Sequence, residues 1–160
     1  MGACAVNHDS THPRLRRLMY LLDTNIVSES RKLGTSRIDP HAAIWLSEID
    51  AETTFVSAMT IFELEIGVQR MERRDAKQGA ALRRWFQDQI MTIYEHRTLP
   101  LTRAVALICA GLHIPDSKSE RDAWIAATAL DAKLTLVSRN VADFANMGVG
   151  LFNPFERRVD

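Results

Sequence analysis

Four acidic residues stand where an α/β protein could use them for chemistry. Asp23 follows an apolar run in LLDTN, Glu63 lies in TIFELEIG, Asp122 in ERDAWIAATAL and Asp143 in SRNVADF. Carboxylates that converge repel one another, and they tolerate this mainly when hard cations lie between them. Mg²⁺ and Mn²⁺ prefer such oxygen ligands and keep several waters. Together the four acids predict metal-assisted phosphodiester hydrolysis, in which metals activate a water and stabilise charge on the attacked phosphate.

Each acid taken alone also has a structural interpretation. A carboxylate near a helix N-terminus gains about 0.3–1 kcal/mol from the helix dipole, which would account for Glu63 or Asp122. Asp143 alone would be a solvated side chain. Asp23 lacks these explanations because it ends a predicted strand, and open parallel sheets bind ligands beyond the carboxyl ends of their strands. The shared placement of all four acids favours a common site.

The hydrophobic pattern indicates the elements that must position these acids. Short apolar or β-branched runs predict strands at 19–22, 53–58, 134–138 and 151–152, with a further extended piece at 98–101. Helices are expected between them, at 24–33, 40–50, from 60 onward, 76–94 and 102–112. The capping-box pattern Ser117-x-x-Glu120 is expected to open another helix. Strands that alternate with helices predict an α/β fold with a mainly parallel sheet.

Length and composition are typical of one globular domain. The chain has 160 residues, 46% of them hydrophobic, and its 20 basic and 20 acidic side chains give no formal net charge. This balance argues against coating of nucleic acid by bulk charge and leaves a local basic face open. Cys4 and Cys109 form no CxxC pair, which favours a reducing compartment over a disulfide framework.

The chain shows no sign of a membrane or export segment. No apolar run approaches the roughly 18 residues of a membrane span, and no segment resembles a secretory signal. We therefore expect a cytoplasmic protein without a membrane partner. Its organisation is expected to be a disordered N-terminal tail at 1–18, one domain at 19–156 and a C-terminal tail at 157–160.

Five segments in order carry a family resemblance. MYLLDTNIVSE, SAMTIFELEIG, RDAWIAATAL and LVSRNVADF, followed by FNPF, resemble a PIN domain, and within that family the VapC/FitB-type toxins of bacterial toxin–antitoxin pairs. The resemblance runs over residues 19–155. It implies a Mg²⁺- or Mn²⁺-dependent endoribonuclease with a three-layer α/β/α fold around a mainly parallel sheet. It further implies cleavage by metal-activated water, leaving 5′-phosphate and 3′-hydroxyl ends.

The resemblance also assigns the site residues. Asp23, Glu63 and Asp122 match the core metal-binding acids of the family. Family members place a fourth acid at either of two positions after the corresponding strand, and here these positions hold Asn140 and Asp143. We expect Asp143 to be the fourth catalytic and metal-binding acid. Polar support is expected from Asn25, Ser138 and Asn140.

Positive charge is concentrated between residues 70 and 84. Arg70 shares the helix face of Glu63, so it is the best candidate for contacting RNA phosphates, followed by Arg73 and Arg74. The alternative, a solvated helical surface with local ion pairs, applies to most of these residues. Gly67 lies on the same face. A glycine inside a helix costs about 1 kcal/mol relative to alanine, which close approach of another backbone or of a substrate would explain.

The resemblance implies several partners. They are an RNA substrate (tRNA, rRNA or mRNA), a VapB-type antitoxin, a second copy in a homodimer and a higher assembly with the antitoxin. Large apolar side chains between 71 and 93 agree with such interfaces, although most are expected in the core.

Two other functions stay open. A PIN-like module could bind RNA or a partner without cutting, although the intact acids argue against this. An aspartyl-phosphate-type phosphatase could use Asp23 as a nucleophile. That class usually has a second Asp two residues later, where this chain has Asn25.

Overall fold

Five parallel strands form the centre of the protein. In a computed structural model that describes residues 18–156, the strands are β1 (Tyr20–Leu22), β2 (Thr54–Ser57), β3 (Thr98–Leu99), β4 (Thr135–Val137) and β5 (Leu151–Phe152). Their spatial order is β3-β2-β1-β4-β5, with every neighbouring pair parallel. The prediction of an α/β fold with a mainly parallel sheet is confirmed. The expected tails at 1–17 and 157–160 lie outside the described residues.

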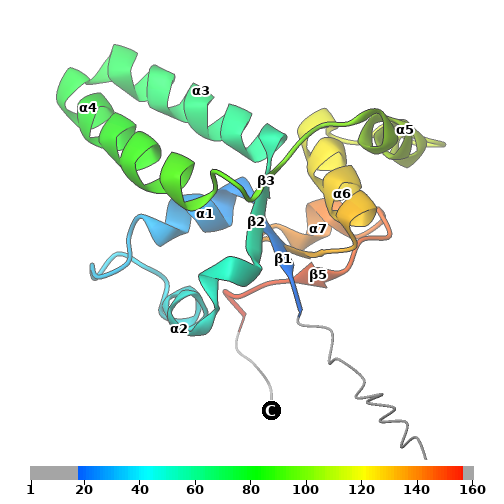
Figure 1. Ribbon diagram of the computed structural model, residues 1–160, viewed down its shortest axis with the longest axis horizontal. Coiled ribbons are helices and arrows are strands. Elements are labelled where there is room, and N and C mark those ends of the chain that lie inside the picture. The colour runs from blue at the N-terminus through cyan, green and yellow to red at the C-terminus, as the bar shows by residue number, and fades with distance from the viewer. Residues whose placement is uncertain (1–17, 157–160) are drawn as a thin grey trace, which may run out of the picture.

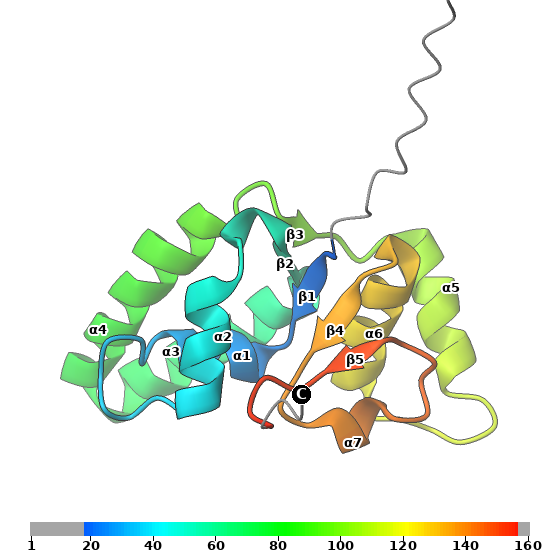
Figure 2. The ribbon, with the colours of Figure 1, turned by 90° about the horizontal axis from the view of Figure 1, so that it is seen from below.

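Helices cover both faces of the sheet. Helices α1 (Thr24–Ser30), α2 (Pro40–Glu48), α3 (Ala58–Arg74) and α4 (Ala76–Trp85) lie on one side, and α5 (Arg103–Leu112), α6 (Glu120–Ala132) and α7 (Val141–Phe144) lie on the other (Figure 2). A 3-10 turn at Ala51–Thr53 precedes β2. Among residues 18–156, no helix combines the length and apolar character needed to cross a membrane.

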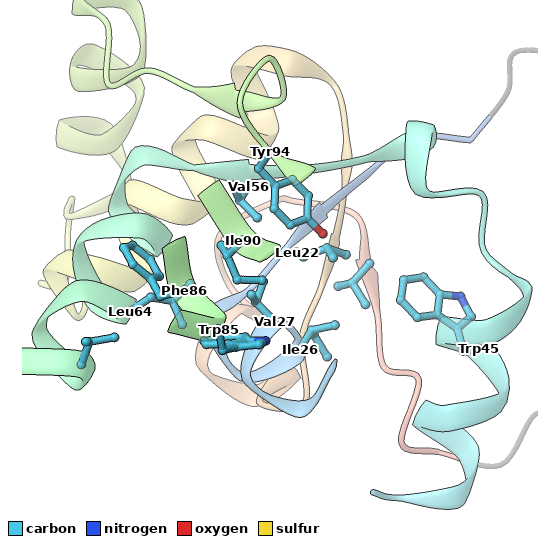
Figure 3. Packing of buried hydrophobic residues seen from close by; sticks show 12 residues of the cluster. Leu22, Ile26, Val27, Trp45, Val56, Leu64, Trp85, Phe86, Ile90 and Tyr94 are labelled. Atoms are coloured by element: carbon cyan, nitrogen blue, oxygen red, sulfur yellow. The ribbon is translucent and has the colours of Figure 1, made fainter. Parts of the chain in front are cut away.

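Successive side chains of a strand point to opposite faces of the sheet, so the strands contribute to two hydrophobic cores. Leu22 faces the α1–α4 side, whereas its neighbour Leu21 packs with Ile125 of α6 and Phe144 of α7. On the first side, Trp85 and Tyr94 join Leu22 in a larger cluster, with Trp45 of α2 at its edge (Figure 3). The central strands are buried on both faces, as parallel sheets require.

Helices α3 and α4 form an antiparallel hairpin that projects from the sheet (Figure 1). Asp75 ends α3 and caps α4 by accepting bonds from the backbone N–H groups of residues 77 and 78. Arg83 of α4 donates to Glu65 and to Glu72 of α3. Gly79 lets the two backbones approach, because a Cβ there would stand 2.4 Å from the Cα of Glu72.

Four details differ from the sequence-based expectations. The capping box is wrong: the backbone N–H of Lys118 donates to His113 Nδ1 at 3.1 Å, so the chain stays irregular beyond Ser117 and α6 begins at Glu120. The helix expected at 76–94 is α-helical only to Trp85 and continues as a π-helix over Phe86–Met91. The helix expected at 24–33 ends at residue 30. The short helix α7 was not predicted.

Candidate active site at the carboxyl edge of the sheet

Asp23 lies at the position where the sheet topology changes direction. It directly follows β1, whose neighbours β2 and β4 carry the chain to opposite sides of the sheet. Ligands of open α/β sheets bind at such a switch point, beyond the carboxyl ends of the strands. Asp23 also caps α1, because its Oδ1 accepts the backbone N–H of Thr24 at 2.7 Å. The sequence-based interpretation that Asp23 has no role at a helix N-terminus is therefore wrong. The local fold therefore fixes both the place and the orientation of this carboxylate.

Ser138 and Asn25 bind the other oxygen of Asp23. Ser138 Oγ donates to Asp23 Oδ2 at 2.6 Å, and Asn25 Nδ2 donates to the same atom at 2.8 Å. Ser138 is fully buried and follows β4, the strand beside β1. The backbone N–H groups of Asn140 and Arg139 donate to Ser138 Oγ and to Asn25 Oδ1. The three residues expected as polar support thus all lie in one network around Asp23.

Glu63 approaches this network from the second turn of α3. Thr24 Oγ1 donates to Glu63 Oε1 at 2.9 Å, which links α1 to α3. Arg121 of α6 lies 3.7 Å from Glu63 Oε2, and its guanidinium carbon stands 5.6 Å from the ring centre of Phe62. The sequence reasoning missed Thr24 and Arg121, although each is the immediate neighbour of a predicted acid.

Electrostatic coupling unites three of the predicted acids. Burial is the largest cause that raises the pKa of Asp23 above its ordinary value, and the charges of Glu63 and Asp122 raise it further. Hydrogen bonds from Ser138 and Thr24 oppose this shift. The charges of Glu63 and Asp122 therefore reach Asp23.

The donor set suits a hard divalent cation that keeps part of its water. An ionised carboxylate offers about four acceptor positions, and three protein donors reach Asp23, one on Oδ1 and two on Oδ2. One position on Oδ1 is left for a ligand. Within residues 18–156, no three acidic, histidine or cysteine side chains are grouped tightly enough to hold an ion directly. Mg²⁺ typically takes one or two carboxylates and completes its shell with waters and substrate phosphates, so these residues fit it.

Asp143 stands apart from the other acids. It lies in the first turn of α7, is exposed, and its backbone N–H donates to the carbonyl oxygen of Asn140. Within the described residues, no hydrogen bond or ion pair joins its side chain to Asp23, Glu63 or Asp122. Its role as the fourth acid stays a prediction.

The predicted RNA-contacting arginines are exposed along α3. Arg70 lies about 10 Å along the helix axis from Glu63, and Arg73 and Arg74 about 15 Å, at 1.5 Å per residue. Arg83 lies in the same basic segment, but it forms ion pairs with two glutamates of α3. Its positive charge is therefore neutralised within the hairpin. Contact of Arg70, Arg73 and Arg74 with RNA stays a prediction.

A cavity opens beside Glu63. Its volume is about 270 Å³, and α1, α3 and α4 form its walls. Thr24 and Glu63 lie at the end shared with the acidic network, while Leu82 and Trp85 of α4 line the other part. Gly67 of α3 contributes a bare stretch of backbone to the wall. The cavity therefore shares Thr24 and Glu63 with the acidic network.

The fold and the site define an α/β protein with an acidic centre at the switch point of a parallel sheet. Comparison with known families specifies this class. The model of the PIN domain family matches residues 20–149, and the chain belongs to that family.

Several known proteins resemble the chain over about half of its length or more. It is 30% identical over 142 residues to Toxin FitB of Neisseria gonorrhoeae, covering 86% of this chain and 99% of that protein. It is 40% identical over 77 residues to Ribonuclease VapC14 of Mycobacterium tuberculosis, covering 48% of this chain and 72% of that protein. A solved FitAB complex bound to an IR36 DNA fragment aligns with a TM-score of 0.78 and 28% identity, covering 88% of this chain and 98% of that chain.

Proposed function

We propose that this protein is a metal-dependent endoribonuclease and the toxin of a toxin–antitoxin pair. The observation that carries the proposal is that Thr24 joins Glu63 to the buried carboxylate of Asp23 at the sheet's switch point. The charge of Asp122 also acts on Asp23. Structural acids do not need to gather in this way. Membership of the PIN domain family and the likeness to VapC14 and Toxin FitB support the same function.

Asp23, Glu63 and Asp122 would hold a Mg²⁺ or Mn²⁺ ion, with Asp143 as the expected fourth acid. When bound, the ion would lower the pKa of a coordinated water and stabilise charge on the attacked phosphate. The positive charge would also offset the mutual repulsion that raises the pKa of Asp23.

The surrounding residues position these acids. Ser138 and Asn25 fix Asp23 Oδ2, so that its remaining acceptor position on Oδ1 keeps one direction. Thr24 orients Glu63 in the same way through its hydroxyl group. Arg121 lies half-exposed at the rim, where its guanidinium can exchange Glu63 for a phosphate oxygen of an incoming RNA strand.

The partners form part of the same proposal. FitB is named a toxin and occurs in a FitAB complex, which supports an antitoxin of the FitA or VapB type for this chain. An RNA substrate, a homodimer, a larger assembly with the antitoxin and a cytoplasmic location complete the proposal.

The test is cleavage of total bacterial RNA by the purified protein with Mg²⁺ or with EDTA. Asp23→Asn and Asp122→Asn should abolish Mg²⁺-dependent discrete fragments, whereas Asp131→Asn, an exposed acid of α6 outside the site, should leave them unchanged. Circular dichroism checks that each variant is folded. Intact RNA with folded wild-type protein would favour a binding module. Hydrolysis of a small phosphomonoester would instead favour the phosphatase.

A further inference from the structure

Gly67 has no explanation within the folded chain. It lies inside α3, one turn after Glu63, with a helical backbone that any residue could adopt. A Cβ at this position would meet nothing within 4 Å. Gly79, by contrast, is required by packing because its Cβ would collide with the Glu72 backbone. Because Gly67 also borders the cavity, it leaves the backbone of α3 open to a ligand at the cavity wall.

The walls of the cavity have the chemistry of a nucleobase site. Leu64, Val68 and Trp85 provide apolar surface, and the Arg31 guanidinium carbon stands 5.9 Å from the centre of the Trp85 ring. Unpaired bases stack on aromatic rings and on guanidinium planes. Ser28 adds a hydroxyl group that can bond a base edge. At about 270 Å³ the cavity is slightly smaller than typical drug-sized pockets, which suits one heterocycle.

We infer that this cavity binds one unpaired nucleobase of the RNA, adjacent to the phosphodiester bond that is cut. The inference rests on the proposed function. A nucleotide is favoured over a peptide side chain because the cavity begins at Glu63 and Thr24, where the neighbour of the scissile phosphate must lie. A base held in a duplex could not enter, so the site selects single-stranded or looped RNA.

The test adds a side chain at the cavity wall without disturbing the fold. Gly67→Leu projects a side chain into the open space, and Gly67→Ala is the smaller step. Gly111→Leu is the matched control, since Gly111 lies in α5, is exposed and would also meet nothing within 4 Å. Thermal unfolding should show all three variants to be at least as stable as the wild type, because glycine is the weaker helix former.

Binding is measured without metal, so that it does not depend on cleavage. The probes are short, labelled single-stranded RNA oligonucleotides and an abasic oligonucleotide of the same length, titrated in EDTA. Gly67→Leu should weaken binding of the base-bearing probe roughly 5- to 150-fold, the range that stacking of one base provides. It should leave the abasic probe unaffected, and Gly111→Leu should bind both probes like the wild type.

Cleavage provides the second measurement. The cleavage site of the wild type is mapped first. An abasic residue next to that site should lower kcat/KM, and so should Gly67→Leu. The two changes together should lower kcat/KM no further than either change alone. Unchanged binding and cleavage by Gly67→Leu would overturn the inference. So would a Gly67→Leu variant that cuts RNA normally and loses only its inhibition by a cognate antitoxin, because the cavity would then hold a peptide. Base-dependent binding lost in Gly67→Leu, with no RNA cut by the wild type, would support the cavity and refute the nuclease.

Discussion

Replacing Ser138 with alanine tests how the Asp23 carboxylate is held. The change removes the donor of the 2.6 Å bond to Asp23 Oδ2 and the acceptor of the Asn140 N–H group, at a position with no exposed surface. Hydrogen bonds to charged groups contribute about 1.5–3 kcal/mol. We therefore expect Ser138→Ala to lower the free energy of unfolding by about that amount at pH 8. In a domain of this size the loss corresponds to a decrease in Tm of roughly 3–12 °C.

The free energy of unfolding that Ser138→Ala loses should depend on pH. The direction of this dependence follows from the native pKa of Asp23. Burial first, and then Glu63 and Asp122, raise the native pKa of Asp23 above the unfolded value, whereas Ser138 lowers it. The native state therefore binds the carboxyl proton of Asp23 more tightly than the unfolded state does. The free energy of unfolding falls as pH rises from about 3.9 through the native pKa. Without Ser138 the native pKa lies higher still, so the decrease is larger. The difference between wild type and variant should be small at pH 4 and largest at pH 8.

Urea unfolding followed by circular dichroism in EDTA, at several pH values between 4 and 8, measures this difference directly. Ser47→Ala is the matched control, because Ser47 is exposed on α2 and its hydroxyl bonds only the carbonyl oxygen of Ile44 in its own helix. Its effect should not vary with pH. A Ser138→Ala penalty that is constant with pH, or larger at pH 4 than at pH 8, would refute the assignment of this bond to a charged Asp23.

Three further predictions concern the hairpin, the cation and the rim. Gly79→Ala should destabilise the protein by about 1–3 kcal/mol, the usual range for overpacking, because its Cβ would stand 2.4 Å from the Glu72 Cα; an unchanged urea midpoint would contradict this packing. Mn²⁺ at a hundredfold excess over its Kd should stabilise the wild type by about 2.7 kcal/mol and not stabilise Asp23→Asn, as measured by thermal shift; equal shifts would place the ion elsewhere. Arg121→Gln should tighten Mn²⁺ binding in calorimetry, since it releases Glu63 from a competing cation. The same variant should bind RNA more weakly in EDTA. Weaker Mn²⁺ binding would show that Arg121 instead supports the site.

The sequence predicted the placement of the acids because that placement is local. Asp23 follows an apolar run that can only be a buried strand, and Glu63 lies early in a strongly periodic helix. The parallel arrangement follows from helices between every pair of strands, and it brings the strand ends to one edge. The fold class and the positions of Asp23 at a strand end and Glu63 in an early helical turn were therefore within reach of pattern reasoning.

Contacts between distant segments were beyond that reasoning. The Thr24–Glu63 bond joins residues 39 positions apart, and the Arg121–Glu63 pair depends on how α6 approaches α3. Arg83 pairs with two glutamates of the neighbouring helix, so its charge is not free on the predicted basic face. This contact between two helices was also not predictable from the local pattern. The capping box at Ser117 failed for a different reason. A competing local contact, from the Lys118 backbone N–H to the side chain of His113 five residues earlier, takes its place.

The pairing of β1 with β4 has a consequence for synthesis of the protein on the ribosome. Asp23 and the Ser138 hydroxyl that orients it are 115 positions apart. Strand β1 can pair early with β2, but it lacks its second neighbour until β4 has emerged. Such non-local pairings form late in folding because a long loop must close first. A nascent chain that already carries Asp23, Glu63 and Asp122 is therefore incomplete until its last quarter has left the exit tunnel. Under the proposed function, the nuclease would stay inactive beside the RNA that encodes it until β4 has paired with β1.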